Sequence, residues 1–316
     1  MKEIGMKNRR LTLGIYYFAV LLIAIAATAL RAVAVMGYLD ISTGYFVENI
    51  YITVSDALIT GAVLLSASYA FFGKCKERLI PIFDGAATYI PAAAVSVALL
   101  FMAVELFSTG FSASTPDWLS VAAAIFTLPA ILGFLFTVLH TQREDTGRGW
   151  FCLAIVVFLL VYSAFLYFDP KLPLNAPCKT VDRMAFLAAT AFFLFETRIS
   201  LGREKWRGYT VFGLIAAAVT LYSSVPSLAM YFVKGQIISN SLYESVLSFA
   251  IFVFISSRLL TSLKMAEDRE DSFVSFIKEN EAAKGASDHV KNSVESAESD
   301  NYTIDFESNK ERNQEQ

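Results

Sequence analysis

The sequence predicts an all-α polytopic integral membrane protein that crosses the bilayer eight times. Hydrophobic residues make up 55% of the 316 residues and charged residues 17%, and the mean hydropathy is +0.52. Ordinary globular domains carry about 25% charged residues. Apolar runs recur along the chain, and Lys and Arg gather in alternate connections between them. Together these observations predict eight transmembrane helices with both termini in the cytoplasm.

The first span follows a cationic N-terminus. Residues 1–10 contain four Lys or Arg, and the apolar run at 11–36 begins at once. This run exceeds the roughly 7 to 15 residues of a signal-peptide core, so we interpret it as a membrane helix rather than a cleaved leader. A helix of about 20 apolar residues crosses a bilayer. Further runs lie at about 47–72, 86–107, 118–140, 150–168, 184–201, 208–232 and 242–263.

The distribution of Lys and Arg orients these helices. Cations in short loops mark the cytoplasmic side of a membrane protein. Near the helix ends, sixteen cations fall on the side that holds both termini and four on the other. Trp118, Trp150 and Trp206 all fall at expected membrane interfaces, where amphipathic rings prefer to lie. We therefore expect an N-in, C-in protein of the plasma membrane.

Two cationic turns resemble one another and raise the question of a repeat. RISLGREKWR at 198–207 and FFGKCKER at 71–78 place a glycine and three cations in register, 129 residues apart. A duplication would give two four-helix halves that enter the membrane in the same orientation, as in parallel-repeat transporters. Glycine and cations are common in cytoplasmic turns, so a match without duplication is the alternative.

The chain changes character after the last span. Residues 266–316 contain fourteen Asp or Glu against six Lys or Arg, a net charge of −8. From about Ala283 onward they are rich in Ser, Asn and Glu and poor in aliphatic residues, a composition that cannot support a core. We expect a transmembrane domain at 1–265 and an acidic, largely disordered cytoplasmic tail at 266–316, which is a candidate site for a cytoplasmic protein partner.

Three ionisable residues within the apolar runs, Arg31, Asp56 and Glu105, are the candidate ligand-binding residues. An ionisable group in hydrocarbon costs about 3 kcal/mol or more unless it is paired or hydrated. Arg31 and Asp56 lie on consecutive helices at depths of about 8 and 9 Å from the outer edge, so the two charges are expected to meet. The pair is either a structural bridge or part of a site for a small solute or ion that opens outward.

A second group of charges lies at the cytoplasmic ends of two spans. Glu196 and Arg198 end the sixth span, and Arg258 lies in the eighth. Long cationic side chains at such positions extend to the membrane surface. We expect these residues to form an interfacial network without a chemical role.

The sequence predicts neither an enzyme nor a cofactor or metal site. It contains no HExxH, no P-loop and no run of aspartates that would hold Mg²⁺. The glycine and serine of the GFS segment at 110–112 resemble part of an intramembrane serine protease motif, but His140 is expected at the opposite membrane face. Two histidines and three separated cysteines are too few and too dispersed for a metal centre, and no feature suggests nucleic acid binding.

Two functions from different classes follow from these patterns. The first is binding or transport of a small solute or ion at an outward-opening site formed by Arg31, Asp56 and Glu105. Prolines within three spans, Pro91, Pro129 and Pro226, would kink their helices. Such kinks are either a matter of helix packing, since prolines are tolerated in membrane helices, or breaks that support such a site. The second is a sensor, scaffold or accessory subunit that recruits a cytoplasmic partner through its tail.

Overall fold

The computed structural model describes residues 2–41, 43–72, 86–112, 117–139, 146–169, 173–201, 206–238 and 241–262. The expected disorder of the 266–316 tail and the cationic turns at 73–85, 140–145 and 202–205 lie outside these residues. Within the described residues each of the eight predicted runs is helical over most of its length. The helices are α1 (Lys2–Tyr38), α2 (Ile50–Phe72), α3 (Ala86–Ser112), α4 (Trp118–Leu139), α5 (Thr146–Phe168), α6 (Pro177–Ser200), α7 (Trp206–Lys234) and a last helix at Leu242–Ser262.

Seven of these helices, among the described residues, are long and apolar enough to cross a membrane. The chain therefore has an all-α, multi-pass membrane fold. The helix outside this group is α6, which is 24 residues long but carries charged residues in its first two turns and near its end. The helix is long enough to cross a membrane, but it is less apolar than the other seven helices and does not count among them on composition.

The start of α6 corrects the expected boundary at residue 184. The helix begins at Pro177, seven residues earlier, with the proline in the first turn, where it lacks no helix hydrogen bond. Hydropathy alone misses this turn because its residues include Lys179 and Asp182. Cys178, which the sequence places in an outer loop, is consequently a buried residue of α6.

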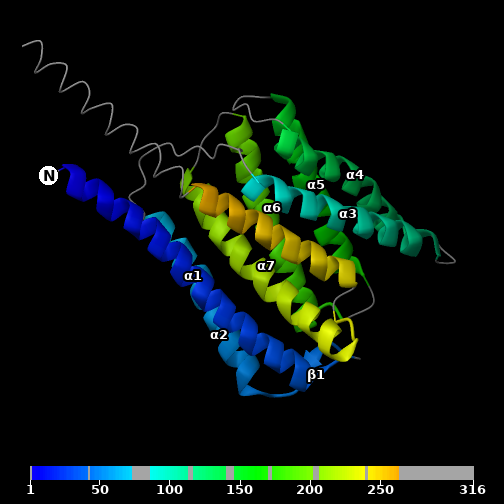
Figure 1. The fold of residues 1–316 in the computed structure, drawn as a ribbon. Coiled ribbons are helices and arrows are strands. Elements are labelled where there is room, and N and C mark those ends of the chain that lie inside the picture. The colour runs from blue at the N-terminus through cyan, green and yellow to red at the C-terminus, as the bar shows by residue number, and fades with distance from the viewer. Residues whose placement is uncertain are drawn as a thin grey trace, which may run out of the picture. The chain divides into compact units, whose positions relative to one another are not determined.

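A short β-hairpin joins α1 to α2 in the segment that the sequence predicts as an outer loop. Strands β1 (Leu39–Asp40) and β2 (Tyr45–Phe46) pair antiparallel. The turn between them includes Gly44 at a φ of 71°, a conformation that glycine adopts without strain. The hairpin lies at the end of the α1 and α2 helices (Figure 1), and we call this the hairpin end of the bundle.

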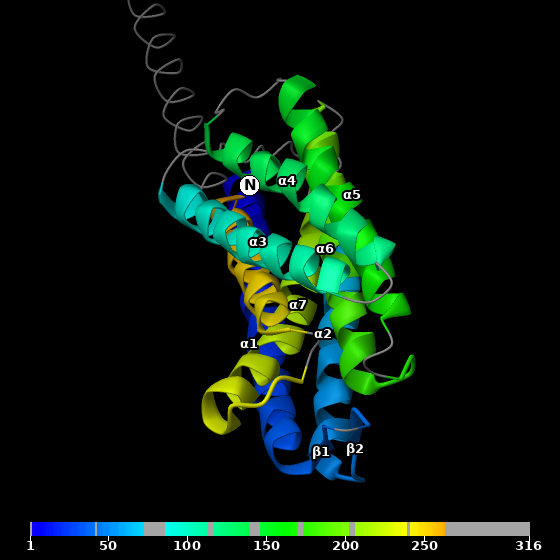
Figure 2. The ribbon, with the colours of Figure 1, turned by 90° about the vertical axis from the view of Figure 1, so that its right-hand side faces the viewer.

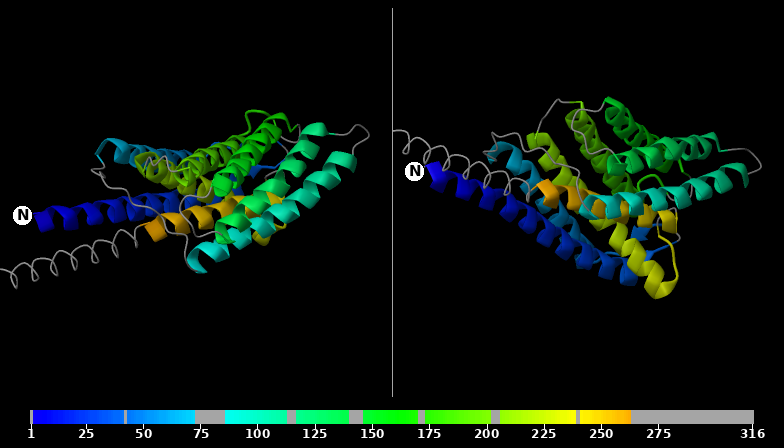
Figure 3. Two further views of the ribbon diagram at one scale, coloured as in Figure 1. Left: turned by 90° about the horizontal axis from the view of Figure 1, so that it is seen from above. Right: turned by 45° about the horizontal axis from the view of Figure 1, so that its top comes forward.

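The helices pack in a series in which α3, α4, α5, α6 and α7 each contact the next, and α7 contacts both α1 and α2. Figure 2 shows α1, α2 and α7 together, with α3 crossing in front of them in that view. The pair α3 and α4 lies side by side in both views of Figure 3. Each half pairs its first two helices, α1 with α2 and α5 with α6, but α6 also packs on the next helix, α7, whereas α2 packs on α7 of the other half. A duplication therefore stays a prediction from the sequence.

The last helix, at Leu242–Ser262, lies among four others. The Phe254 ring is 5.3 Å from that of Phe134 on α4 and 5.7 Å from that of Phe193 on α6. Ser248 donates a hydrogen bond to the α7 backbone, and Tyr243 stacks on a phenylalanine of α3 at a centroid distance of 5.7 Å. Aromatic packing thus holds α3, α4 and α6 against this helix, and the Ser248 hydrogen bond connects it to α7.

Helices α4 and α5 approach closely at Gly133, which gives a stability prediction. A Cβ at this position would lie 2.6 Å from the carbonyl oxygen of Phe151 and 2.9 Å from Ile155. Backbone at that distance cannot move aside freely, so Gly133→Ala should lower the free energy of unfolding by about 1 to 3 kcal/mol. The measurement is the thermal unfolding midpoint of the purified protein in detergent.

The matched control is Gly61→Ala on α2, because a Cβ there meets nothing within 4 Å. Alanine is the better helix former, so this variant should unfold at or slightly above the wild-type temperature. Equal destabilisation by the two substitutions would contradict the close approach of α4 to α5.

Candidate functional site

Arg31 is the charged centre of the candidate site. It lies on α1 near the hairpin end, and only 3% of the residue is exposed. Its Nη1 is 3.8 Å from Oδ1 of Asp56 on α2, so the ion pair expected from the matched depths is present. The guanidinium also lies over two aromatic rings, 4.6 Å from the centroid of Tyr222 and 6.0 Å from that of Phe46. These rings provide cation–π contacts in place of water.

Tyr222 connects α7 to two residues of α2, Asp56 and Ser55. Its hydroxyl donates to Oδ1 of Asp56 at 2.5 Å and lies 2.8 Å from Oγ of Ser55. The side chain of Asp56 nevertheless remains 57% exposed, while that of Arg31 is 4% exposed. Asp56 is therefore the exposed member of the pair and Arg31 the buried one.

Asp182 is a buried carboxylate on α6 that precedes the predicted span at 184–201 and is not one of the three predicted site residues. Its Oδ1 accepts a hydrogen bond of 2.5 Å from Ser223 on α7. It interacts electrostatically with Arg31 as well. Arg31, Asp56, Asp182 and Tyr222 thus form one group from four helices, which we call the Arg31 cluster. The helix-starting signal of Pro177 could have brought Asp182 into the prediction.

Among the residues that the structure describes, Glu105 makes no ion pair or hydrogen bond with Arg31 or Asp56. It belongs to a second group around Tyr162 of α5, a buried residue that interacts electrostatically with Glu105 of α3 and Glu244 of the last helix. Tyr162 interacts with Asp182 too, so Asp182 connects this group to the Arg31 cluster. Glu244 is also buried. Together the two groups contain one guanidinium and four carboxylates.

A proline lies next to the Arg31 cluster. Pro226 is inside α7 and has no N–H, so the carbonyl of Tyr222, four residues earlier, loses its helix donor. Two serine hydroxyls bond neighbouring carbonyls, with Ser224 donating to Thr220 at 2.7 Å and Ser227 to Ser223 at 3.3 Å. The helix nevertheless continues through Pro226 to Lys234.

The charges at the opposite end of the bundle do not form the expected interfacial network. Glu196 and Arg258 make an ion pair between α6 and the last helix, with side chains 1% and 0% exposed. Arg198 lies apart from them, over the ring of Phe195 at 5.9 Å. Ser200 lies one turn after Glu196 and is also buried, so this face of α6 points into the bundle up to the end of the helix. The Glu196–Arg258 pair therefore lies inside the bundle and not at the membrane surface.

Among the residues that the structure describes, no group of three or more His, Cys, Asp or Glu could hold a metal ion. The carboxylates of the two groups are thus separate, and each acts as an individual charge or hydrogen-bond acceptor. This arrangement can attract a small cation or an ammonium group, because carboxylates outnumber cations there. Comparisons with family models, with curated proteins and with solved structures gave no match.

Proposed function

We propose that this chain is an eight-span protein of the plasma membrane, with both termini cytoplasmic, that binds and transports a small cationic solute or ion. The cation bias of the connections supports the orientation. Counting α6 as the eighth span is supported by its 24 residues and by the pairing of its buried charge Glu196. With this orientation the hairpin end faces outward.

The observation that carries the proposal is the burial of Arg31 together with Asp182 inside the helical bundle, with Asp56 at their open side. Ionisable residues within membrane helices are costly, and they commonly mark substrate or ion pathways. Within the two groups, four carboxyl groups accompany one guanidinium, so acidic side chains outnumber cationic ones there. A cation or an organic ammonium compound is therefore favoured over an anion.

The test measures thermal unfolding of the full-length protein in detergent with added chloride salts of Na⁺, K⁺, methylammonium or choline at constant ionic strength. A ligand at 100 times its Kd stabilises the folded state by about 2.7 kcal/mol. At least one of these cations should raise the unfolding temperature in a saturable way, and Asp56→Asn should remove the rise. Proteoliposomes loaded with that cation then test transport.

The control is Glu48→Gln, which removes an exposed carboxylate between the hairpin and α2. It lies outside both groups and should leave the cation-dependent rise unchanged. A response to none of these cations, or the same rise in Asp56→Asn as in the wild type, would contradict the proposal.

Truncation after Met265 distinguishes cation binding and transport by the membrane domain from recruitment of a partner through the tail. A protein that acts through its membrane domain should keep the cation-dependent rise, and cells should keep the associated phenotype. Loss of the phenotype with unchanged membrane levels and unchanged cation binding would favour the tail as the functional part.

A further inference from the structure

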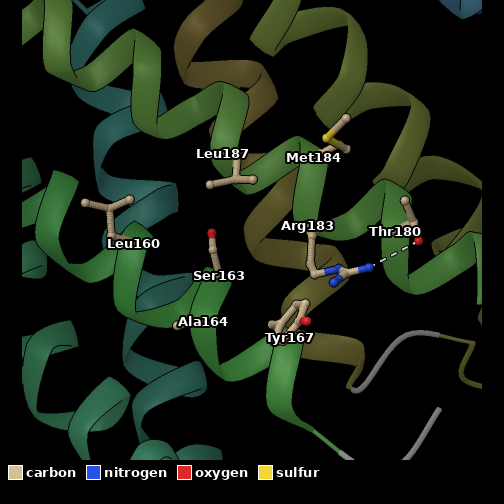
Figure 4. A pocket seen from close by; sticks show the side chains of 8 residues that line it. All are labelled: Leu160, Ser163, Ala164, Tyr167, Thr180, Arg183, Met184 and Leu187. Carbon is tan, nitrogen blue, oxygen red and sulfur yellow. Dashed lines mark hydrogen bonds between the residues drawn. The ribbon is translucent and has the colours of Figure 1, made fainter. Parts of the chain in front are cut away.

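A groove between α5 and α6 lies apart from both groups of buried charges. Its volume is about 370 Å³, and its lining includes Leu160, Ala164 and Tyr167 from α5 and Arg183, Met184 and Leu187 from α6, with two hydroxyl residues between them. Figure 4 shows Arg183 and Tyr167 toward one end of the groove and Leu160 and Leu187 toward the other. We call this site the α5/α6 groove.

The guanidinium of Arg183 is held in place at its end of the groove. Its Nη2 donates to the carbonyl of Leu174 at 3.0 Å and to Oγ1 of Thr180 at 3.2 Å, and its centre lies 5.2 Å from the ring of Tyr167. Its Nε donates to the carbonyl of Lys179 at 3.4 Å. Within the described part of the chain these bonds use Nε and Nη2, so Nη1 is available to an acceptor in the groove.

The rest of the groove is apolar and faces away from the bundle core. Leu160, Met184 and Leu187 are exposed large hydrophobic residues that line it. On a membrane helix such residues face lipid chains. The groove thus presents a fixed cation at one end and a hydrocarbon surface along the remainder, which matches an amphiphile with an anionic headgroup.

The sequence supports the same ligand. Of the four cations on the expected outer side, three fall between residues 169 and 183, close to the start of α6. Cations are unusual on the outer side of a membrane protein. The Lys179 ammonium donates to the Asp169 carbonyl, so Lys179 serves the connection between α5 and α6, whereas Arg183 points into the groove.

We propose that the α5/α6 groove binds one anionic phospholipid of the outer leaflet. The phosphate accepts hydrogen bonds from Nη1 of Arg183, and an acyl chain runs along Leu160 and Leu187. Guanidinium groups bind phosphate oxygens with charge-assisted hydrogen bonds. The inference is independent of the proposed cation binding, because Arg183 belongs to neither group of buried charges.

Native mass spectrometry of the full-length protein tests this site with phosphatidylglycerol and phosphatidylcholine as probes. Both lipids carry the phosphate, but the choline ammonium of phosphatidylcholine cancels its net charge and is repelled by Arg183. The wild type should therefore retain one phosphatidylglycerol with an affinity about tenfold higher than for phosphatidylcholine, a factor that corresponds to about 1.4 kcal/mol. Arg183→Gln should remove this preference. Ala164→Phe, which fills the groove without changing charge, should reduce retention of both lipids.

The matched control is Arg198→Gln, because Arg198 is also on α6 and also lies over an aromatic ring, at the other end of the helix. This variant should keep the preference for phosphatidylglycerol. The proposal fails if the wild type retains both lipids equally or if Arg183→Gln keeps the preference for phosphatidylglycerol. It also fails if Arg198→Gln reduces this preference as much as Arg183→Gln does. Equal retention by a folded Ala164→Phe protein would place the acyl chain outside the groove.

Discussion

Replacing Glu196 by alanine should produce the largest loss of stability of any single substitution considered for this chain. Arg258 would keep its charge at a position where none of its side chain is exposed, without the carboxylate that now contacts Nη2. Removal of one partner from a buried ion pair costs about 3 to 5 kcal/mol. The expected result is a large fall in the thermal unfolding midpoint and in the yield of monodisperse protein from membranes.

A double replacement separates the cost of the unpaired charge from that of lost packing. Glu196→Leu combined with Arg258→Met removes both charges and keeps much of the apolar volume, so stability should recover substantially over either single variant. Arg198→Gln serves as the neighbouring control and should have little effect, because that side chain lies outside the pair. A normal unfolding temperature for Glu196→Ala would show that this pair is not buried in the membrane protein.

Reversal of Arg31 to aspartate should give the second large effect. The new carboxylate would lie buried between Asp56 and Asp182, with like charges where an ion pair now stands. The expected loss is about 3 kcal/mol or more, measured as the unfolding midpoint in detergent. Asp56→Arg should cost less, on the order of 1 kcal/mol, because the exposed side chain at position 56 can turn away from Arg31.

The double reversal of Arg31 and Asp56 should restore stability only in part. The exchanged pair regains its attraction, but Asp182 then faces a carboxylate in place of a guanidinium. The coupling energy from the four proteins isolates the pair itself. Additivity of the two single effects would contradict a direct interaction between the residues at 31 and 56.

The sequence was sufficient to predict the helices and the Arg31–Asp56 pair, because both depend on local patterns. Long apolar runs indicate helices, and equal depth on two consecutive antiparallel helices brings their charges together. Depth does not indicate the direction in which a side chain points around its helix. Glu105 could therefore be placed near the outer edge, but its electrostatic interaction with Tyr162 rather than an ion pair with Arg31 could not be predicted.

Contacts between distant segments could not be predicted either, because they too depend on the direction in which each side chain points around its helix. Glu196 and Arg258 are 62 residues apart, and their pairing depends on which faces of α6 and the last helix meet. The inclusion of Asp182 required the earlier start of α6, which polar residues in its first turns hide from hydropathy. Pro177 was the local signal that indicates this start.

The central claim is that water reaches Asp56 from the outer side of the membrane. In a protein whose Cys75, Cys152 and Cys178 are replaced by alanine, the measurement is labelling of Asp56→Cys by a membrane-impermeant maleimide on intact cells. The thiol should react, because maleimide chemistry needs a hydrated thiolate. Leu201 is exposed and directly follows α6, at the end of the bundle that the proposed orientation places in the cytoplasm, so Leu201→Cys should react only after permeabilisation. Labelling of Asp56→Cys only after permeabilisation, or its complete protection, would contradict an outward-opening site at Arg31 and Asp56.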